Sequence, residues 1–533
     1  MERHCQEEIF EELARPEFYP HPVARVDVRE THISKVFLTG SIVYKFKKPV
    51  DFGFLDYTTL DKRRYFCDCE TRLNRRLSTG VYLGTIAVTD ENDHFALEGS
   101  GTPLEYAVKM RQLPQDASLL HLLKANRIDD AAVNRLARRL ADFYRRAETG
   151  AHVNDVGSWE TVRDNCEENF TQMDAHVGEN LDQRQYEIVR SAARAYLHRR
   201  RALFNQRVQN GKIRDCHGDL RSGHIYFDDG IQIIDCIEFN QRFRYADITS
   251  DLAFLVMDLD FEGYPKTARQ LVGEFVRTAA DPDAYALLDF YKCYRAMVRA
   301  KVSCFRMAEL SPSQYEYRRT QREATKFLEL AYRYAVQFAR PTLWILFGMP
   351  AAGKSTIAAE LSRIMNIEVL RSDVTRKQLF GLPPDQSMVT AFEEGIYSKE
   401  ATALTYGKLL MAAQDQLEKG NSIIVDATFS KSHQRREALR LARDMDVNII
   451  FVECRAPQNV LARRLKRREE KTSVSDARLQ HLAKIRRRFD ALEDISEDRR
   501  ISVNTEMPLE ESLNRILNHD YFLTWQQVEA KVT

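Results

Sequence analysis

Lys354 and Ser355 end a glycine-rich turn within the stretch LWILFGMPAAGKST at 343–356. Gly348, four intervening residues and then Gly353 come before them, which is the phosphate-binding loop pattern GxxxxGK followed by Ser or Thr. Glycine lets successive backbone N–H groups point at phosphate oxygens, and the helix that follows adds the positive end of its dipole. The stretch therefore predicts a nucleotide-binding site.

The side chains at the end of this turn have distinct roles in such a site. Lys354 is expected to reach the β and γ phosphates of a nucleotide, and the Ser355 hydroxyl to ligate Mg²⁺. Thr356 completes the predicted nucleotide-binding residues. ATP and Mg²⁺ are the cofactors that follow from this pattern.

Asp373 and Arg376 lie one helical turn apart in RSDVTRKQL, just after an expected strand. A carboxylate at this place can take the proton of a substrate hydroxyl, while the arginine holds the acceptor or its phosphate. Asp373 as a plain helix cap is the alternative.

Asp426 ends an expected strand in IIVDATF, the position of a carboxylate that orients Mg²⁺. Ala427 follows it, whereas an ATP-hydrolysing motor would usually have a second acid there to activate water. The pattern therefore favours phosphoryl transfer to a bound acceptor.

Arg464 and Arg468 are four residues apart in an expected helix at 458–468. Both can face one side and close over the transferring phosphoryl group. A solvated basic helix is the alternative.

A second group of ionisable residues surrounds an expected hairpin at 225–234 and comprises His217, Asp219, His224, Asp235 and Glu238. Carboxylates placed around a tight hairpin can hold Mg²⁺ and take a hydroxyl proton. Asp247 and Asp251 follow at the start of a helix, where they can simply complement its dipole.

The composition excludes some classes of protein. In 533 residues, 79 Lys and Arg nearly balance 78 Asp and Glu, so no global positive field indicates a nucleic-acid binder. The nine cysteines form no CxxC pair, which predicts reduced thiols. Without an apolar signal core or a run of 18 apolar residues, a cytoplasmic protein with no membrane contact is expected.

Two domains are expected, 1–339 and 340–533, because the last helix of the first ends before Pro341. The second domain alternates helices with strands at 367–370, 422–425, 448–452 and 501–503, which predicts an α/β P-loop NTPase fold with a parallel sheet and a helical lid. The first domain is α+β, with a hairpin at 35–46, a helix at 59–77, strands at 82–88 and 106–110, and then mostly helices.

The motifs of the second domain resemble a known family. GMPAAGKST, RSDVTR, IIVDATF, the arginine-rich helix and the closing ISVNTE are similar to the P-loop kinase family that contains phage polynucleotide kinase, zeta toxins, chloramphenicol phosphotransferase and gluconate kinase. The resemblance implies that Asp373 is the general base and Arg376 an acceptor-site cation. Arg464 and Arg468 would be lid arginines.

The first domain resembles the aminoglycoside phosphotransferase branch of the bilobal protein-kinase-like fold, through HGD at 217–219, IIDCIEFN, and Asp247 and Asp251 ahead of LAFL. The resemblance implies that Asp219 is the catalytic base and Asp235 a metal ligand. It also implies that Lys45 pairs with Glu70 to position ATP phosphates, and that 106–113 is the hinge strand. Lys47 lies on the same strand face as Lys45, and spacing alone does not separate the two.

His224 departs from this pattern, which has Asn five residues after the catalytic Asp. Imidazole is a poor ligand for Mg²⁺, so the site uses another metal, is rearranged, or binds nucleotide without efficient transfer. No GxGxxG loop precedes Lys45 either. The whole chain resembles bacterial fusion proteins described as bifunctional aminoglycoside phosphotransferase/ATP-binding proteins.

The main hypothesis is an ATP-dependent kinase whose second domain phosphorylates a hydroxyl on a small polyol, a nucleoside-like metabolite or a polynucleotide 5′ end. The first domain would be a second phosphotransferase or a nucleotide-binding regulatory site. The alternative is a nucleotide-sensing regulator without efficient transfer, and an ATP-hydrolysing remodeller is disfavoured by Ala427. The sequence leaves the acceptor, the oligomeric state and the coupling between domains open.

Overall fold

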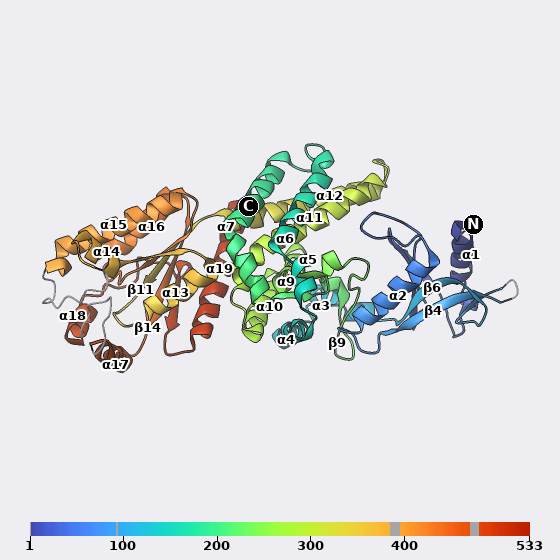
Figure 1. Ribbon diagram of the computed structural model, residues 1–533, viewed down its shortest axis with the longest axis horizontal. Coiled ribbons are helices and arrows are strands. Elements are labelled where there is room, and N and C mark those ends of the chain that lie inside the picture. Colours follow the sequence, from blue (N-terminus) through green and yellow to red (C-terminus); the bar gives the residue numbers. More distant parts are fainter. Residues whose placement is uncertain (1, 92–93, 384–394, 470–478, 533) are drawn as a thin grey trace. The chain divides into compact units, whose positions relative to one another are not determined.

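The computed structural model describes residues 2–91, 94–383, 395–469 and 479–532 (Figure 1). By packing, the chain forms two compact units, Met1–Asn165 with Phe204–Phe275, and Cys166–Leu203 with Val276–Thr533. The predicted domains 1–339 and 340–533 were defined by sequence motifs, whereas these two units are defined by packing. The division into domains therefore stays a prediction.

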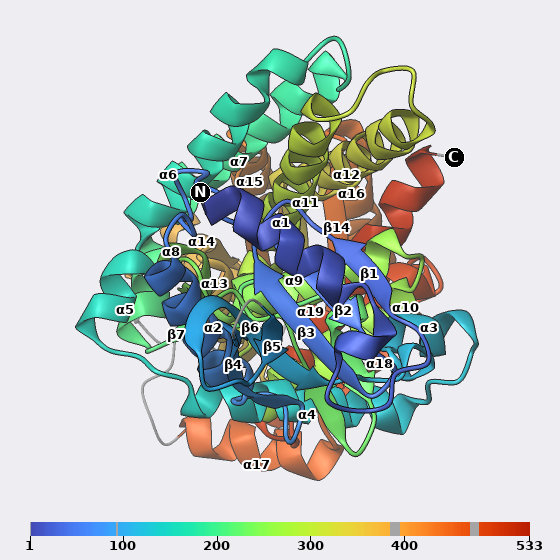
Figure 2. The same cartoon turned by 90° about the vertical axis from the view of Figure 1, so that its right-hand side faces the viewer.

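A six-stranded antiparallel sheet begins the first unit, in the order β1-β2-β3-β6-β4-β5. Figure 2 looks onto this sheet, which is drawn in shades of blue with its helices. Its elements are α1 (Glu2–Leu13), β1 (Asp27–Glu30), β2 (Ser34–Leu38), β3 (Ile42–Lys47), α2 (Leu60–Asn74), β4 (Tyr82–Asp90), β5 (Phe95–Leu97) and β6 (Thr102–Arg111). The hairpin, the helix and the two strands predicted here are therefore present.

The alternation of β3 side chains decides which residues reach the site. Tyr44 and Phe46 pack with Phe10 of α1 in one buried cluster, on one face of the sheet. Lys45 and Lys47 alternate with these residues along the strand, so their side chains project from the other face of the sheet, where both contact Glu70 of α2. One strand thus supplies a core face and a charged face.

Two small strand pairs carry the ionisable residues of the first unit. Strands β7 (Ile213–Asp215) and β10 (Tyr245–Asp247) pair antiparallel, and β8 (Ile225–Phe227) and β9 (Ile231–Ile233) form the predicted hairpin. The surrounding helices are α3 (Leu119–Lys124), α4 (Asp130–Arg146), α5 (Ala151–Val156), α8 (Gln241–Arg244) and α9 (Ile248–Phe261). Helices α6 (Trp159–Met173), α7 (Gln183–Gln209) and α10 (Pro265–Ala279) have residues in both units.

The second unit contains a five-stranded parallel sheet in the order β12-β13-β11-β14-β15. Its strands are β11 (Thr342–Phe347), β12 (Glu368–Arg371), β13 (Ile423–Asp426), β14 (Asn448–Arg455) and β15 (Arg500–Asn504), which confirms each predicted strand. Every residue of β11 is buried, as expected for the central strand of a sheet covered on both faces.

Helices cover both faces of this sheet. Trp344 and Leu346 of β11 pack with α13 (Lys354–Met365), α17 (Gln458–Glu469) and α19 (Leu509–Val532). Leu343 and Ile345 point to the other face and pack with α15 (Lys399–Glu418) and α16 (Ser432–Asp444). The remaining helices of this unit are α11 (Ala284–Ala308), α12 (Tyr315–Ala339), α14 (Ser372–Leu379) and α18 (Leu482–Arg487).

None of the helices in the described ranges combines the length and hydropathy that a membrane crossing needs. Eight of the cysteines, Cys67, Cys69, Cys166, Cys216, Cys236, Cys293, Cys304 and Cys454, are buried, and none of these eight forms a disulfide bond.

Candidate active site

The phosphate-binding loop connects β11 to α13 and depends on its glycines. Gly348 has φ +129° and Gly353 has φ +91°, conformations that disfavour any side chain. A Cβ on Gly348 would also lie 2.4 Å from the Cys454 carbonyl oxygen, which belongs to β14. The loop between them can therefore keep its backbone close to the sheet and turn its amides outward.

The side chains that end this loop meet the end of the next strand. The Ser355 hydroxyl donates to Oδ2 of Asp426 over 2.6 Å, and the Lys354 ammonium donates to the Gly348 and Met349 carbonyls over 3.2 and 3.0 Å. Parallel pairing of β11 with β13 causes this meeting, because both strands end at the same edge of the sheet. A hydroxyl and a carboxylate are oxygen donors, which fit Mg²⁺.

A cavity of about 460 Å³ lies beside the loop. Arg464 forms part of its wall and donates to the Ala351 carbonyl over 3.3 Å and to the hydroxyl and carbonyl oxygens of Thr505 over 2.9 and 2.8 Å. The lining residues are Ala351, Gly353, Thr356, Ile357, Arg464, Arg467, Arg468, Thr505, Met507, Leu509 and Ser512. Thr505 belongs to the ISVNTE motif, but no role was predicted for this residue individually.

Arg468 and Asp373 lie at the same edge of the sheet. Burial lowers the pKa of Arg468, and the carboxylates of Asp373 and Asp426 act in the opposite direction. Arg468, which is predicted to be a lid arginine, therefore interacts with both acids. Asp373 lies in the first turn of α14, directly after β12, as the sequence predicts.

Arg376 is placed differently from the other predicted residues. It is buried, donates to the Ile396 carbonyl over 2.7 Å and to the Thr402 hydroxyl over 3.3 Å, and lies over the Tyr397 ring. Its contacts tie α14 to the start of α15. Its role as an acceptor-site cation stays a prediction.

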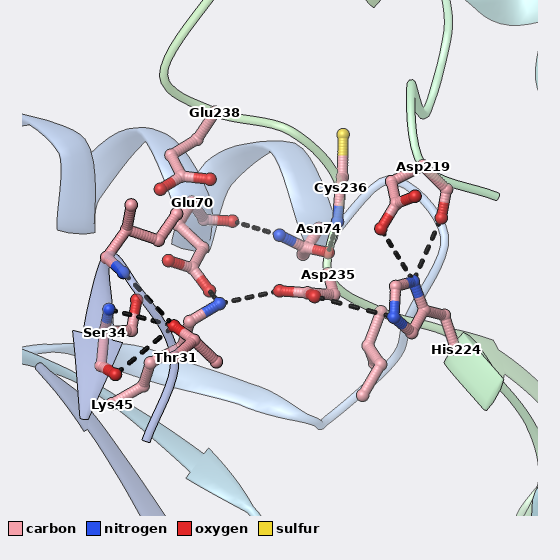
Figure 3. A network of polar contacts seen from close by, with 12 residues as sticks. Thr31, Ser34, Lys45, Glu70, Asn74, Asp219, His224, Asp235, Cys236 and Glu238 are labelled. Carbon is pink, nitrogen blue, oxygen red and sulfur yellow. Dashed lines mark hydrogen bonds and ion pairs between the residues drawn. The ribbon is translucent and has the colours of Figure 1, made fainter. Parts of the chain in front are cut away.

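In the first unit, Lys45 and Lys47 share Glu70. The Lys45 ammonium is 2.8 Å from Oε1 of Glu70 and 2.6 Å from Oδ1 of Asp235 (Figure 3). Lys47 is fully buried and contacts Oε2 of Glu70 and the Glu238 carboxylate. Only Lys45 reaches Asp235, so the geometry favours Lys45 over Lys47 as the phosphate-positioning lysine.

Asp219, His224 and Asp235 converge at the hairpin (Figure 3). One ligand atom from each lies within 4.8 Å of the others. Burial, followed by the positive charge of Arg221, lowers the pKa of His224, so its imidazole is neutral at pH 7. The structure therefore brings the predicted base and both predicted metal ligands together.

Buried acids hold the HGD segment in place. The Asp251 carboxylate accepts hydrogen bonds from the backbone N–H groups of His217 and Gly218, over 2.9 and 2.8 Å. Asp247 accepts from the Thr249 N–H at the start of α9 and pairs with buried Arg207. The capping role suggested by the sequence holds for Asp247. The support of the HGD loop by Asp251 was not predicted, because it depends on contacts with residues 33 and 34 positions away in the sequence.

The charge on Glu70 makes the stability of the first unit depend on pH. Burial opposes ionisation, but the Lys45 and Lys47 ammonium groups outweigh it and hold the pKa of Glu70 below its ordinary value of 4.5. A carboxyl group with a lowered folded-state pKa stabilises the fold above its unfolded-state pKa, and this stabilisation is lost as the pH falls. We expect the difference in unfolding free energy between wild type and Glu70→Gln to be constant above about pH 5.5 and to shrink below pH 4.5. Urea unfolding at a series of pH values measures it, and a difference that grows as the pH falls would contradict the assignment.

Comparisons with known proteins agree with the motifs. Residues 95–288 match the phosphotransferase enzyme family, and residues 343–492 match an AAA domain family. Among solved structures, a choline/ethanolamine kinase family protein from Mesorhizobium loti is 11% identical with a TM-score of 0.36, covering 62% of this chain and 99% of that chain. A gluconokinase from Sinorhizobium meliloti is 17% identical with a TM-score of 0.25, covering 36% of this chain and 96% of that chain. Likeness at this level carries no weight for the substrate.

The matches define the class as a fusion of an aminoglycoside phosphotransferase-like domain, of protein-kinase-like α+β fold, with a P-loop kinase domain. An uncharacterized protein of Mycobacterium tuberculosis, Rv2004c, is 30% identical over 449 residues, which are 84% of this chain and 87% of that protein. An uncharacterized protein of Mycobacterium bovis matches with the same values. The chain belongs to the family of these mycobacterial proteins. Both of its domains are of phosphotransferase type, and the acceptor is undetermined.

Proposed function

We propose that this protein is an ATP-dependent kinase whose C-terminal P-loop domain transfers the γ-phosphoryl group to a hydroxyl. The observation that carries the proposal is the 2.6 Å contact between the Ser355 hydroxyl and the Asp426 carboxylate. Ser355 lies between Gly353 and Thr356, which line the cavity together with Arg464. This pair supplies the oxygen ligands that Mg²⁺ requires beside a phosphate-binding loop. When bound there, Mg²⁺ would neutralise charge on the β and γ phosphates.

The chain's own groups account for the remaining parts of such a transfer. Backbone amides of the loop and the Lys354 ammonium bind the phosphates, and Arg468 faces the charge that develops on the transferring group. Asp373 accepts the proton of the attacking hydroxyl, and its carboxylate lies close to Arg468. Arg376 acts indirectly in this account, because it fixes α14, on which Asp373 sits.

ATP hydrolysis is the less favoured chemistry. Ala427 is buried directly after Asp426, where a water-activating acid would otherwise stand. Phosphoryl transfer to a bound acceptor needs no such acid, because the acceptor hydroxyl replaces water.

The N-terminal domain is proposed as a second nucleotide site, either a phosphotransferase or a regulatory lobe. A specific observation favours the regulatory alternative: Lys45 is paired with Asp235, and Arg221 donates two hydrogen bonds to the Asp219 carboxylate. The predicted base and the predicted metal ligand are thereby engaged by cations of the chain itself. Nucleotide or metal binding would have to compete with these pairs.

The proposal can be tested with ATP labelled at the γ position. Transfer of the label is measured to libraries of polyols, nucleosides and 5′-hydroxyl oligonucleotides. We expect a labelled product with at least one class, and a loss of about 10²-fold or more with Lys354→Ala. Lys419→Ala is the matched control and should retain the activity, because Lys419 is an exposed lysine directly after α15 that pairs with Asp415. ATP binding without product in every class would favour the nucleotide sensor. Acceptor-independent ATP hydrolysis that survives Asp373→Asn would favour the remodeller.

A further inference from the structure

The guanidinium of Arg221 lies between the Asp219 carboxylate and the His224 ring. Its Nε and Nη2 donate to the two carboxylate oxygens of Asp219 over 3.0 and 2.8 Å. Nη2 is also 2.9 Å from Nε2 of His224. A cation of the chain thus already occupies the place where a carboxylate and an imidazole meet.

The contacts of His224 define which ring nitrogen carries its proton. Nδ1 is 3.0 Å from the Asp219 carbonyl oxygen, which can only accept, so Nδ1 is the donor. Nε2 faces a guanidinium, which can only donate, so Nε2 holds the lone pair. A backbone carbonyl that fixes the tautomer of a histidine is the usual outer contact of a metal-binding imidazole.

The lone pair of Nε2 points toward further ligands. Oδ2 of Asp235 is 3.6 Å from Nε2, and one atom each of Asp219, His224 and Asp235 lie within 4.8 Å of one another. Two ligands on opposite sides of an ion with bonds of about 2.1 Å are about 4.2 Å apart. Asp235 also adopts a left-handed backbone with φ +65°, a conformation that few non-glycine residues hold.

The turn that carries His224 does not depend on the Arg221 side chain. The Asp258 carboxylate accepts from both the backbone N–H and the hydroxyl of Ser222, over 2.8 and 2.5 Å. The backbone of His224 is also bonded to the Ile234 N–H. The guanidinium can therefore leave while the ligands stay in place.

We propose that Asp219, Nε2 of His224 and Asp235 form a site for a divalent first-row transition-metal ion such as Mn²⁺, in preference to Mg²⁺, and that the ion displaces the Arg221 guanidinium. Two carboxylates and one imidazole suit Mn²⁺, whereas Mg²⁺ prefers oxygen ligands alone. The proposal concerns metal affinity in the N-terminal domain. It does not depend on whether the C-terminal domain transfers a phosphoryl group.

The proposal can be tested by measuring Mn²⁺ binding to the full chain. The protein is first freed of metal with a chelator and is then studied without nucleotide or acceptor. We expect electron paramagnetic resonance to show one Mn²⁺ bound per chain, displaced by Mg²⁺ only at about 100-fold or greater excess. Electron spin echo modulation should show ¹⁴N coupling to that Mn²⁺, replaced by ¹⁵N coupling in protein grown with ¹⁵N-histidine. Binding without histidine nitrogen coupling, or no binding at millimolar Mn²⁺, would overturn the proposal with the wild-type protein alone.

Variants then separate the ligand from the displaced cation. His224→Asn should weaken Mn²⁺ binding by about 10- to 100-fold and remove the nitrogen coupling, while His433→Asn, at an exposed position of α16, should change neither. Arg221→Gln should tighten Mn²⁺ binding by about 10-fold, because the competing positive charge is gone. Mn²⁺ affinity that is unchanged in His224→Asn, or reduced in Arg221→Gln with the fold intact by circular dichroism, would contradict the assignment.

Discussion

Replacing Asp373 by asparagine is expected to lower the rate of acceptor phosphorylation by about 10²- to 10⁴-fold. The amide cannot take the proton of the attacking hydroxyl, and it removes the negative charge that lies close to Arg468. Nucleotide affinity should stay near the wild-type value, because Asp373 lies in the first turn of α14, outside the loop between Gly348 and Ser355. Calorimetry with ATP and single-turnover transfer assays measure the two quantities separately.

Asp415→Asn is the matched control for this prediction. Asp415 is an exposed carboxylate of α15 that pairs only weakly with Lys419 across one helical turn, so its loss should leave transfer unchanged. Full activity in Asp373→Asn would remove the general-base assignment. A parallel loss of nucleotide affinity would mean that Asp373 supports the loop rather than the acceptor.

Replacing Glu70 by alanine is expected to destabilise the first packing unit by about 3 kcal/mol or more. Glu70 is fully buried and pairs with Lys45 through one oxygen and with Lys47 through the other. Its removal leaves Lys47 buried with Glu238 as its remaining carboxylate, and Lys45 with Asp235. Removing one member of a buried charge cluster leaves the other charges buried with fewer partners of opposite sign. This costs more unfolding free energy than the loss of a surface pair.

Glu12→Ala provides the contrast. Glu12 pairs with Arg15 on the surface of the same unit, over 2.8 Å, and its removal should change the unfolding free energy by no more than about 0.5 kcal/mol. Urea unfolding followed by far-ultraviolet circular dichroism compares the two variants. Equal effects would show that the charge cluster around Glu70 contributes no more than a solvated pair.

The parts of the C-terminal site that follow from local pattern could be predicted from the sequence. The loop from Gly348 to Ser355 is fixed by glycine positions and by the strand and helix on either side of it. Asp426 ends a buried strand, and parallel strands end at one edge of a sheet, so its proximity to Ser355 follows from the strand assignment alone.

Other features depend on side-chain directions that a sequence pattern does not carry. Arg376 has the spacing of an acceptor ligand, and its hydrogen bonds to Ile396 and Thr402 could not be predicted from that spacing. Lys45 and Lys47 are equivalent by strand period, and only the position of Asp235 distinguishes them. Arg221 stands beside the HGD motif, yet its contact with His224 could not be read from spacing.

A structure of the full chain with a non-hydrolysable ATP analogue and Mg²⁺ would show whether the phosphate-binding loop holds a triphosphate. We expect the triphosphate within the amides between Gly348 and Ser355, with the Lys354 ammonium moved from the Gly348 and Met349 carbonyls onto the β and γ phosphates. We also expect the Asp373 carboxylate to face the space beyond the γ phosphate. A triphosphate bound elsewhere, or an Asp373 directed away from that space, would contradict these expectations.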